Sequence, residues 1–208
     1  MIDAINKMQD LDKKFEKIIV PTQKKVLEQY TNNGTITLEI GCGPGQYRYI
    51  VKGSYVGIDI SNKPYNEKYL RMIDIMANAN ALPFKPASFN LVFFSNTFYH
   101  FNNPFEMLEE AVYVLKPGGR LVIFDYSKPV HNYLDKLYSI TCPGSRAYSK
   151  ACREWNALFE ESGIKNIKFK IGSQNSVVGL AEKYLPRGML WFCIDHIRCN
   201  IYITGEKQ

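Results

Sequence analysis

The sequence lacks the features that mark membrane-spanning, disulfide-stabilised and zinc-binding proteins. No apolar run in its 208 residues reaches the roughly 18 residues that a membrane-spanning helix needs. The five cysteines are odd in number and include no CxxC pair, so we expect neither a disulfide framework nor a metal site. Charges are scattered through residues 1–17, which contain no apolar core of a signal peptide. We therefore expect a cytoplasmic protein with reduced thiols.

The composition is that of an ordinary folded chain, with 46% hydrophobic and 22% charged residues. Lysine and arginine total 26 against 20 acidic residues, and residues 120–208 hold 13 of the basic and 8 of the acidic ones. This local surplus favours an anionic partner. No basic block is long enough to indicate nucleic-acid binding, so nucleic acid is not the expected partner. The composition leaves the oligomeric state open.

Short apolar runs alternate with stretches of helical spacing after residue 34. Continuous apolar strands of this kind are typical of parallel sheets that are buried on both faces. The pattern predicts an α/β, doubly wound fold with a seven-stranded, mostly parallel sheet. The expected strands span residues 35–40, 55–60, 71–75, 90–94, 120–125, 165–171 and 198–204. The expected helices span residues 2–19, 21–30, 64–70, 104–115 and 149–162, with a short helix ending near residue 51 and a turn at 116–119.

A glycine-rich loop, Gly41-Cys42-Gly43-Pro44-Gly45, lies between an expected strand and a short helix. Glycine lets the backbone approach a ligand closely, and a helix N-terminus favours negative charge. Asp59 follows Gly41 by 18 residues and ends the next strand, where a carboxylate can accept hydrogen bonds from both hydroxyls of a ribose. Together these residues predict a site for a nucleoside-containing cofactor.

Two residues argue against a dinucleotide in this site. The dinucleotide fingerprint GxGxxG requires glycine at its sixth position, where this chain has Gln46. Glu39 lies at the end of the preceding strand, where its charge would repel a pyrophosphate but would suit an ammonium group. S-adenosylmethionine offers an ammonium, a carboxylate, a ribose and an adenine, and it is therefore the expected cofactor.

Several ordered motifs reinforce this expectation: LEIGCGPGQY (38–47), VGIDIS (56–61), ALPF (81–84), SFNLVFFSNTFYHF (88–101) and LEEAVYVLKPGGRLVIFDYS (108–127). The set resembles the motifs of class I S-adenosylmethionine-dependent methyltransferases of the type 11 group. The resemblance covers roughly residues 35–127 and, more loosely, residues 149–171. It implies a Rossmann-like methyltransferase fold, with S-adenosylhomocysteine as the product formed from the cofactor.

The length favours one domain over residues 1–208, which the resemblance divides into a core and two flanking parts. Two long connections are expected to act as lids or contact surfaces near the substrate. The expected parts are an N-terminal helical cap (1–34), a cofactor-binding core (35–127) and a substrate-side half (128–208), with insertions at 126–148 and 172–197.

The resemblance also implies the roles of individual residues. Glu39 and the glycine loop would hold the methionine part of the cofactor, and Asp59 would bind the ribose. Asn78 stands where the family usually has an aspartate that faces the adenine amino group, and its amide oxygen can accept that bond without charge assistance. Asn90 replaces another common aspartate, with an expected structural role. The implied cofactor residues are Glu39, Gly41, Cys42, Gly43, Gly45, Gln46, Asp59, Ile60, Ser61, Asn78, Ala79, Ser95 and Asn96.

The implied reaction is in-line displacement at the sulfonium methyl, so the cofactor already carries the activated group. The protein must align the reacting groups and exclude water, and a general base is needed only for an acceptor that loses a proton. The candidate catalytic residues are Tyr99 and His100, just beyond the fourth strand, and Asp125, at the end of the fifth. A packing role for His100 is the alternative to a catalytic one.

The expected acceptor is a small molecule, anionic or aromatic. FDYSKP (124–129) and YLDKLYSITCPGS (133–145) resemble a segment of ubiquinone/menaquinone-pathway C-methyltransferases, so a phenolic quinone precursor is one candidate. Residues 95–98 lack the Asn/Asp-Pro-Pro-aromatic motif that is used to methylate amino groups of bases. The alternatives are a macromolecular acceptor such as tRNA or protein, and a catalytically degenerate subunit that serves a partner.

Overall fold

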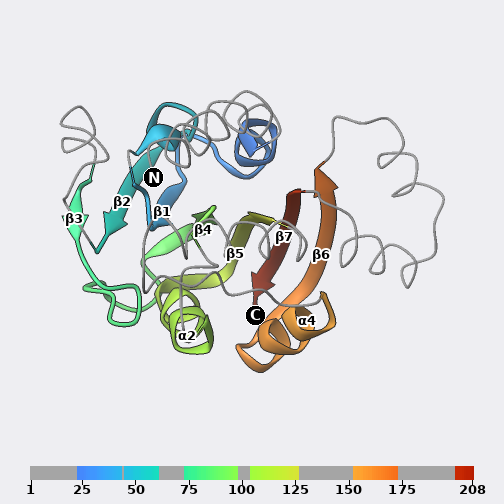
Figure 1. Ribbon diagram of the computed structural model, residues 1–208. Coiled ribbons are helices and arrows are strands. Elements are labelled where there is room, and N and C mark those ends of the chain that lie inside the picture. Colours follow the sequence, from blue (N-terminus) through green and yellow to red (C-terminus); the bar gives the residue numbers. More distant parts are fainter. Residues whose placement is uncertain (1–22, 44, 61–72, 98–103, 127–151, 173–199) are drawn as a thin grey trace, which may run out of the picture.

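A computed structural model gives the structure of residues 23–43, 45–60, 73–97, 104–126, 152–172 and 200–208 (Figure 1). Residues 23–30 form a helix that precedes the first strand. The elements that follow are β1 (Ile36–Ile40), η1 (Gln46–Tyr49), β2 (Ser54–Asp59), β3 (Ile75–Met76), β4 (Phe89–Ser95), α2 (Pro104–Val114), β5 (Leu115–Tyr126), α4 (Cys152–Glu161), β6 (Ile164–Gly172) and β7 (Asn200–Lys207).

The strands form one seven-stranded sheet in the order β3-β2-β1-β4-β5-β7-β6. Strands β1 to β5 pair in parallel, and only β7 runs antiparallel, between β5 and β6. The predicted α/β class and the mostly parallel sheet are therefore confirmed. The strand order reverses between β1 and β4, and ligands of open α/β sheets bind beyond the carboxyl ends of the strands at such a point.

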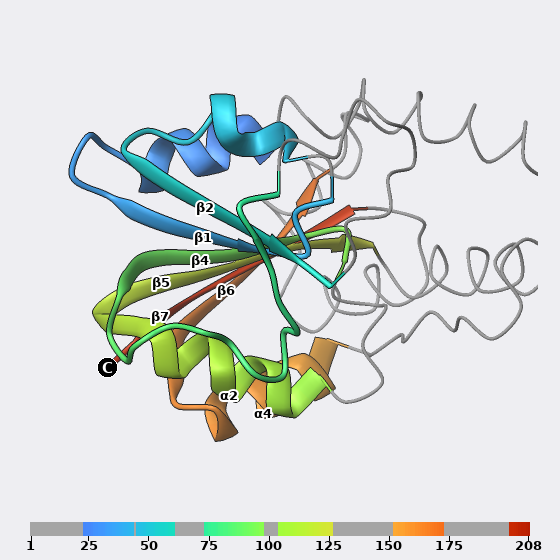
Figure 2. The ribbon, with the colours of Figure 1, turned by 90° about the vertical axis from the view of Figure 1, so that its left-hand side faces the viewer.

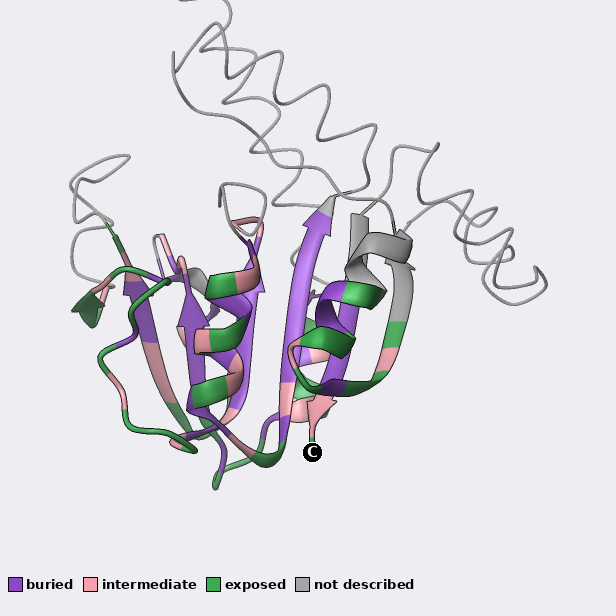
Figure 3. Cartoon of the chain, turned by 90° about the horizontal axis from the view of Figure 1, so that it is seen from below, coloured by how far each residue is buried: buried purple, intermediate pink, exposed green. Residues whose placement is uncertain are grey.

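Helices cover both faces of the sheet (Figure 2). Helix α2 and helix α4 lie on one face, while the helix at residues 23–30 and the 3-10 helix η1 lie on the other. The apolar positions of α2 recur every three or four residues, which gives the helix one buried stripe against the sheet and an exposed outer side (Figure 3). On the other face, Leu27 and Tyr47 pack against Phe93 and Phe124.

The predicted strand at 71–75 is wrong in its bounds, because β3 comprises only Ile75–Met76 and residues 71–72 lie outside the described part. The Asp74 carboxylate accepts the Gly57 N–H of β2 at 2.7 Å. The Asp74 carboxylate thus accepts a hydrogen bond that a backbone carbonyl of β3 would accept if this strand were longer. Aspartate is also disfavoured in strands.

The turn predicted at 116–119 is likewise revised, since β5 begins at Leu115. Pairing with β4 jumps from Phe89↔Leu115 to Leu91↔Arg120, so the residues between them form a bulge in the strand. Gly118 has a φ of 72° in this bulge, a value that glycine adopts at little cost.

The other described elements begin and end close to their predicted bounds. The predicted helices at 2–19 and 64–70 lie outside the described residues, as do residues 127–148 and 173–197 of the two insertions. In the part of the chain that the structure describes, no helix combines the length and apolarity needed to cross a membrane.

Candidate functional site

The glycine loop joins β1 to η1 at the carboxyl edge of the sheet. Gly41, Gly43 and Gly45 all have left-handed backbone, with φ values of 71°, 49° and 66°. A Cβ at Gly41 would clash with the Thr97 side chain, which follows β4. A Cβ at Gly43 would meet no described atom within 4 Å, so this glycine leaves open space beside the backbone.

The N–H groups of the loop are used within the chain. Those of Gly41 and Cys42 both donate to the Ile58 carbonyl at 2.9 Å, and that of Gly45 donates to the Cys42 carbonyl at 2.8 Å. The Gly43 N–H donates to the Asp59 Oδ2 at 2.9 Å. The loop therefore lacks the cluster of free N–H donors that a phosphate site requires, and it sits beside carboxylates instead.

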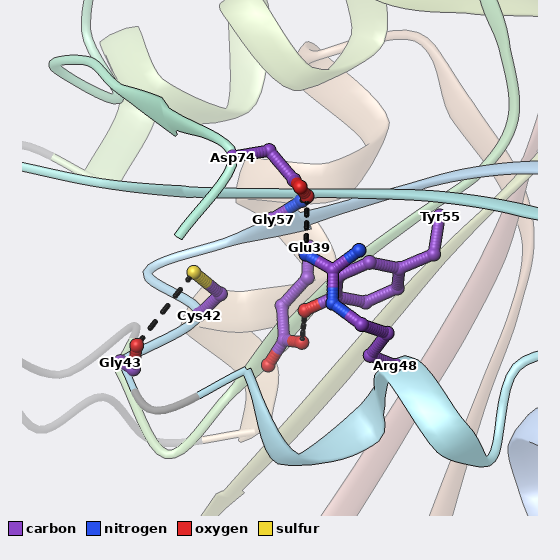
Figure 4. Close-up of polar contacts among 7 residues, drawn as sticks. All are labelled: Glu39, Cys42, Gly43, Arg48, Tyr55, Gly57 and Asp74. Carbon is purple, nitrogen blue, oxygen red and sulfur yellow. Dashed lines mark hydrogen bonds and ion pairs between the residues drawn. The ribbon is translucent and has the colours of Figure 1, made fainter. Parts of the chain in front are cut away.

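Glu39 is a buried carboxyl group, with an exposed fraction of 1%, and it receives a hydrogen bond from the Tyr55 hydroxyl (Figure 4). Burial raises the pKa of Glu39 well above its usual value. The Tyr55 hydrogen bond opposes this increase in the pKa of Glu39, the Asp59 charge adds to it, and the Arg48 charge opposes it. Among the described residues, no cationic side chain forms an ion pair with Glu39.

Arg48 of η1 contacts Tyr55, the hydrogen-bond partner of Glu39, and also Asp74, which precedes the edge strand β3. Its guanidinium lies 4.7 Å from the centroid of the Tyr55 ring and 2.6 Å from the Asp74 Oδ2. Cys42 lies beside the same residues, and burial raises the pKa of its thiol, with added contributions from the charges of Glu39, Asp59 and Asp74. The buried thiol is therefore protonated at neutral pH, so its side chain acts as a small packing group rather than as a nucleophile.

The loop after β3 places Asn78 and Ala79 beside the end of β2, because the Ala77 N–H donates to the Asp59 carbonyl at 2.9 Å. The Asn78 Oδ1 accepts the Asn80 N–H at 3.0 Å, which closes a local turn. Helix α2 holds this turn from the other side, where Glu106 accepts the Asn80 side-chain amide at 3.2 Å and Glu110 accepts the Leu82 N–H at 2.7 Å.

The end of β4 carries a buried polar chain. The Ser95 hydroxyl donates to the Tyr47 hydroxyl at 2.8 Å, and the Tyr47 hydroxyl donates to the Gln23 Oε1. Asn96 follows in left-handed conformation, with a φ of 52°, and its N–H donates to the Phe124 carbonyl at 2.9 Å. The chain links the helix at 23–30 to the carboxyl edge of the sheet.

The structure brings most of the predicted cofactor residues to this edge. Ile60, just past β2, is 70% exposed, as is suitable for packing against a ligand. Asp125 is the residue before the last of β5, which lies beyond β4, and its side chain is 2% exposed. Four predicted positions fall outside the described part of the chain, namely Ser61, Tyr99, His100 and the side chain of Gln46. No group of three or more His, Cys, Asp or Glu side chains placed to hold a metal occurs among the described residues.

Sequence reasoning missed Tyr55, Arg48, Tyr47 and Glu110. Tyr55 and Gly57 lie on the same face of β2, and Gly57 pairs with Glu39 of β1. This register places Tyr55 one pair away from Glu39 and could have suggested the contact. The other three carry no local signal, since their hydrogen-bond partners lie 24 to 48 residues away in the sequence.

Known proteins resemble this chain in sequence and fold. A family model described as a methyltransferase domain matches residues 38–123. An uncharacterized protein of Methanocaldococcus jannaschii is 33% identical over 170 residues, which cover 77% of this chain and 80% of that protein. The ubiquinone/menaquinone biosynthesis C-methyltransferase UbiE of Wigglesworthia glossinidia brevipalpis is 33% identical over 126 residues, 56% of this chain. The chain matches 48%, or about half, of that relative's length.

A solved structure confirms the fold. The YcgJ protein of Bacillus subtilis matches with a TM-score of 0.62 and 19% identity, over 90% of this chain and 97% of that one. The matched segment 38–123 contains the glycine loop, Asp59, the loop after β3 and the end of β4, which together line the edge described above. The chain therefore belongs to the class I S-adenosylmethionine-dependent methyltransferases.

Proposed function

We propose that this methyltransferase transfers the methyl group of S-adenosylmethionine to a small-molecule acceptor, and that the edge formed by β1, β2, β3 and β4 holds the cofactor. The supporting observation is the use of the loop N–H groups, of which Gly43 donates to Asp59 at 2.9 Å. A pyrophosphate would need such donors for itself. A ligand with an ammonium group instead uses carboxylates such as Glu39.

The residues of the edge fit this cofactor. Gly43 leaves open space for a ligand close to the backbone. A carboxylate offers about four acceptor positions, so Asp59 can serve ribose hydroxyls in addition to the Gly43 N–H. The Asn78 amide oxygen has two lone pairs, of which the Asn80 N–H uses one, and the other can accept from an adenine amino group. Glu39 provides a buried acidic group for the cofactor's ammonium.

The cofactor supplies a methyl group that is already activated on sulfur. The contribution of the chain is to hold the two substrates in line and to keep water away from the reacting atoms. We assign Ser95 and Asn96, at the end of β4, to the methionine part of the cofactor. Asp125, Tyr99 and His100 remain the candidate residues for moving a proton from the acceptor.

A small acceptor is supported by the distribution of charge. Most of the net charge of +6 comes from residues 120–208, but the sequence contains no basic block of the kind that is typical of a nucleic-acid surface. The relative from Wigglesworthia is named for ubiquinone and menaquinone biosynthesis, so phenolic quinone precursors are the first acceptors to test. An anionic ring compound would also suit the basic surplus in residues 120–208.

The cofactor site is tested by calorimetric titration with S-adenosylmethionine, S-adenosylhomocysteine and, as a control, NADH. We expect both sulfur ligands to bind and NADH not to bind. Asp59→Ala should abolish binding, whereas Glu109→Ala, an exposed change on α2, should leave it unchanged. Binding of NADH, or unchanged binding by Asp59→Ala, would contradict the assignment of the site.

The acceptor class is tested with a labelled methyl group. The protein and labelled S-adenosylmethionine are incubated with a cell extract that ultrafiltration has divided into small-molecule and macromolecular fractions. We expect label to enter the small-molecule fraction with the wild-type protein and not with Asp59→Ala. Label confined to RNA or protein would establish a macromolecular acceptor instead. Absence of transfer to either fraction, despite cofactor binding, would favour the degenerate subunit.

A further inference from the structure

We propose that Tyr55 is a positioning residue for Glu39, and that Glu39 gives up a proton to solvent when the cofactor's ammonium group binds beside it. The proposal rests on the proposed cofactor site and adds a proton-linked step to it. Its consequence is that cofactor affinity depends on pH through one buried carboxyl group.

Glu39 is buried at 1% exposure and lacks a cationic partner among the described residues. An ionised carboxylate in such a place is costly unless a cation compensates it. The fully buried Thr37, on the same face of β1, contributes no described hydrogen bond to it. The described side chains therefore leave the compensating cation to be supplied by a ligand, and the ammonium of the proposed cofactor is such a cation.

Tyr55 fixes the orientation of this carboxyl group. Its hydroxyl donates to the Glu39 Oε2, and Figure 4 shows the two side chains pointing toward one another from neighbouring strands. The ring is held by the Arg48 guanidinium at 4.7 Å from its centroid. A Cβ at Gly57 would lie 2.8 Å from the Tyr55 hydroxyl oxygen, so glycine at this position makes room for the phenol.

Three groups of the packed elements act on the pKa of the Glu39 carboxyl group, and a fourth, Cys42, lies nearby without a charge. From β2, Tyr55 donates a hydrogen bond that lowers the pKa of Glu39, and the like charge of Asp59 raises it. The opposite charge of Arg48, from η1, lowers this pKa, but the Arg48 guanidinium already forms an ion pair with Asp74. Cys42 of the loop is a neutral thiol, as its raised pKa requires. Burial outweighs these neighbours and raises the pKa of Glu39.

The sign of the pH dependence follows from this arrangement. The empty site favours protonated Glu39, and the ammonium favours the ionised form, so binding releases a proton between the two corresponding pKa values. Affinity then rises with pH across that window, by up to about tenfold per unit for one proton. It becomes constant above the pKa of Glu39 in the empty protein.

The experiment measures the affinity of S-adenosylhomocysteine by calorimetry from about pH 5 to about pH 7, where an α-amino group stays protonated. Each pH is measured in two buffers of different ionisation enthalpy, which reports the protons released. The control ligand is 5′-methylthioadenosine, which has the nucleoside and the sulfur but no ammonium group. The variants are Glu39→Gln, Tyr55→Phe and, as a matched control, Tyr49→Phe, whose ring is 78% exposed.

We expect the affinity for S-adenosylhomocysteine to rise with pH in the wild-type protein and in Tyr49→Phe. Glu39→Gln should show a flat profile without proton release. Tyr55→Phe should shift the rise to higher pH, because the hydrogen bond that stabilises the carboxylate is lost. The affinity for 5′-methylthioadenosine should be independent of pH throughout.

Three results would overturn the inference. If S-adenosylhomocysteine binds without pH dependence, the proposed site stands and the proton-linked step is wrong. If Tyr55→Phe has the wild-type profile, Tyr55 does not position Glu39. If neither ligand binds to any folded variant, the proposed cofactor site fails and the inference fails with it.

Discussion

The Leu82 backbone N–H donates a 2.7 Å hydrogen bond to the Glu110 carboxylate, although the two residues lie 28 positions apart in the sequence. One turn earlier on α2, Glu106 accepts the Asn80 side-chain amide at 3.2 Å. Helix α2 packs against the sheet through its buried stripe, so these two carboxylates connect the rigid core to the loop that carries Asn78 and Ala79. The adenine end of the proposed site is therefore shaped by a helix that does not line it.

Glu110→Ala should weaken the binding of S-adenosylhomocysteine and of 5′-methylthioadenosine to the same extent. A hydrogen bond from a backbone N–H to a charged group contributes about 1.5–3 kcal/mol to the order of this loop, so the expected loss of affinity is several-fold and at most roughly a hundredfold. The two ligands should lose the same factor of affinity because both carry the adenine that this loop is proposed to bind. Calorimetric titration of both ligands measures the effect, and Glu109→Ala, exposed on the same helix, should change neither affinity.

A loss confined to S-adenosylhomocysteine would contradict this role for Glu110. That selective pattern is instead expected of Glu39→Gln, because only S-adenosylhomocysteine has the ammonium group. The pair of variants thus separates the two ends of the site in a single set of titrations.

Gly43→Ala should impair cofactor binding far more than it impairs folding. The left-handed backbone at Gly43 costs a non-glycine residue about 1–2 kcal/mol, and the added methyl group meets no described atom. The methyl group would occupy the open space that we assign to the ligand, so affinity for S-adenosylhomocysteine should fall at least about tenfold, a loss of about 1.4 kcal/mol. Denaturant unfolding and calorimetry measure the two quantities.

Gly118→Ala is the matched control for Gly43→Ala. Gly118 also has a positive φ, 72°, and open space at its Cβ, but it lies in the bulge of β5 before Arg120. We expect Gly118→Ala to lower the free energy of unfolding as much as Gly43→Ala does, without a loss of affinity for S-adenosylhomocysteine. Equal losses of affinity in the two variants would show that Gly43 is not close to the ligand.

The sequence predicted the parts of this molecule that depend on local pattern. The glycine loop, Glu39 and Asp59 were found because strand periodicity, glycine content and the spacing between strands are all visible along the chain. Tyr55 reads as an ordinary aromatic residue of a strand, and Glu110 as a solvated charge on a helix. The contact of Glu110 depends on tertiary packing and that of Tyr55 on the pairing of β1 with β2, and the residues adjacent in sequence encode neither. The shortness of β3 also depends on a tertiary contact, because the Asp74 carboxylate accepts the Gly57 N–H in place of a backbone carbonyl.

Tyr47→Phe should destabilise the protein by about 1–3 kcal/mol. The Tyr47 hydroxyl accepts from Ser95 and donates to Gln23, and both partners are buried, so its removal leaves two polar side chains without this partner. The free energy of unfolding from urea titrations measures the loss. Tyr49→Phe, two residues along η1 with a 78% exposed ring, should be neutral, and equal values for the two variants would contradict a stabilising role for this polar chain.

Glu39→Gln should stabilise the ligand-free protein, and the gain should grow as pH rises. Burial raises the pKa of Glu39 in the folded state above its value in the unfolded chain, so the folded state binds the proton more tightly. The stability associated with this group is complete below the unfolded pKa, and it is lost as pH rises through the folded pKa. Glutamine does not titrate, so the variant keeps the stability that the wild-type protein loses, at about 1.4 kcal/mol for each unit of pKa difference.

Urea titrations of both proteins at several pH values from about 4, near the pKa of an unperturbed glutamate, to about 8 test this expectation. The difference between the variant and the wild-type protein isolates Glu39, because all other titrating groups are shared. Glu28→Gln, an exposed change on the helix at 23–30, controls for the loss of one negative charge and should give a difference that is small at every pH. A difference for Glu39→Gln that stays constant with pH would mean that this carboxyl group is already ionised in the empty protein. In that case a cation other than the cofactor's ammonium must compensate it.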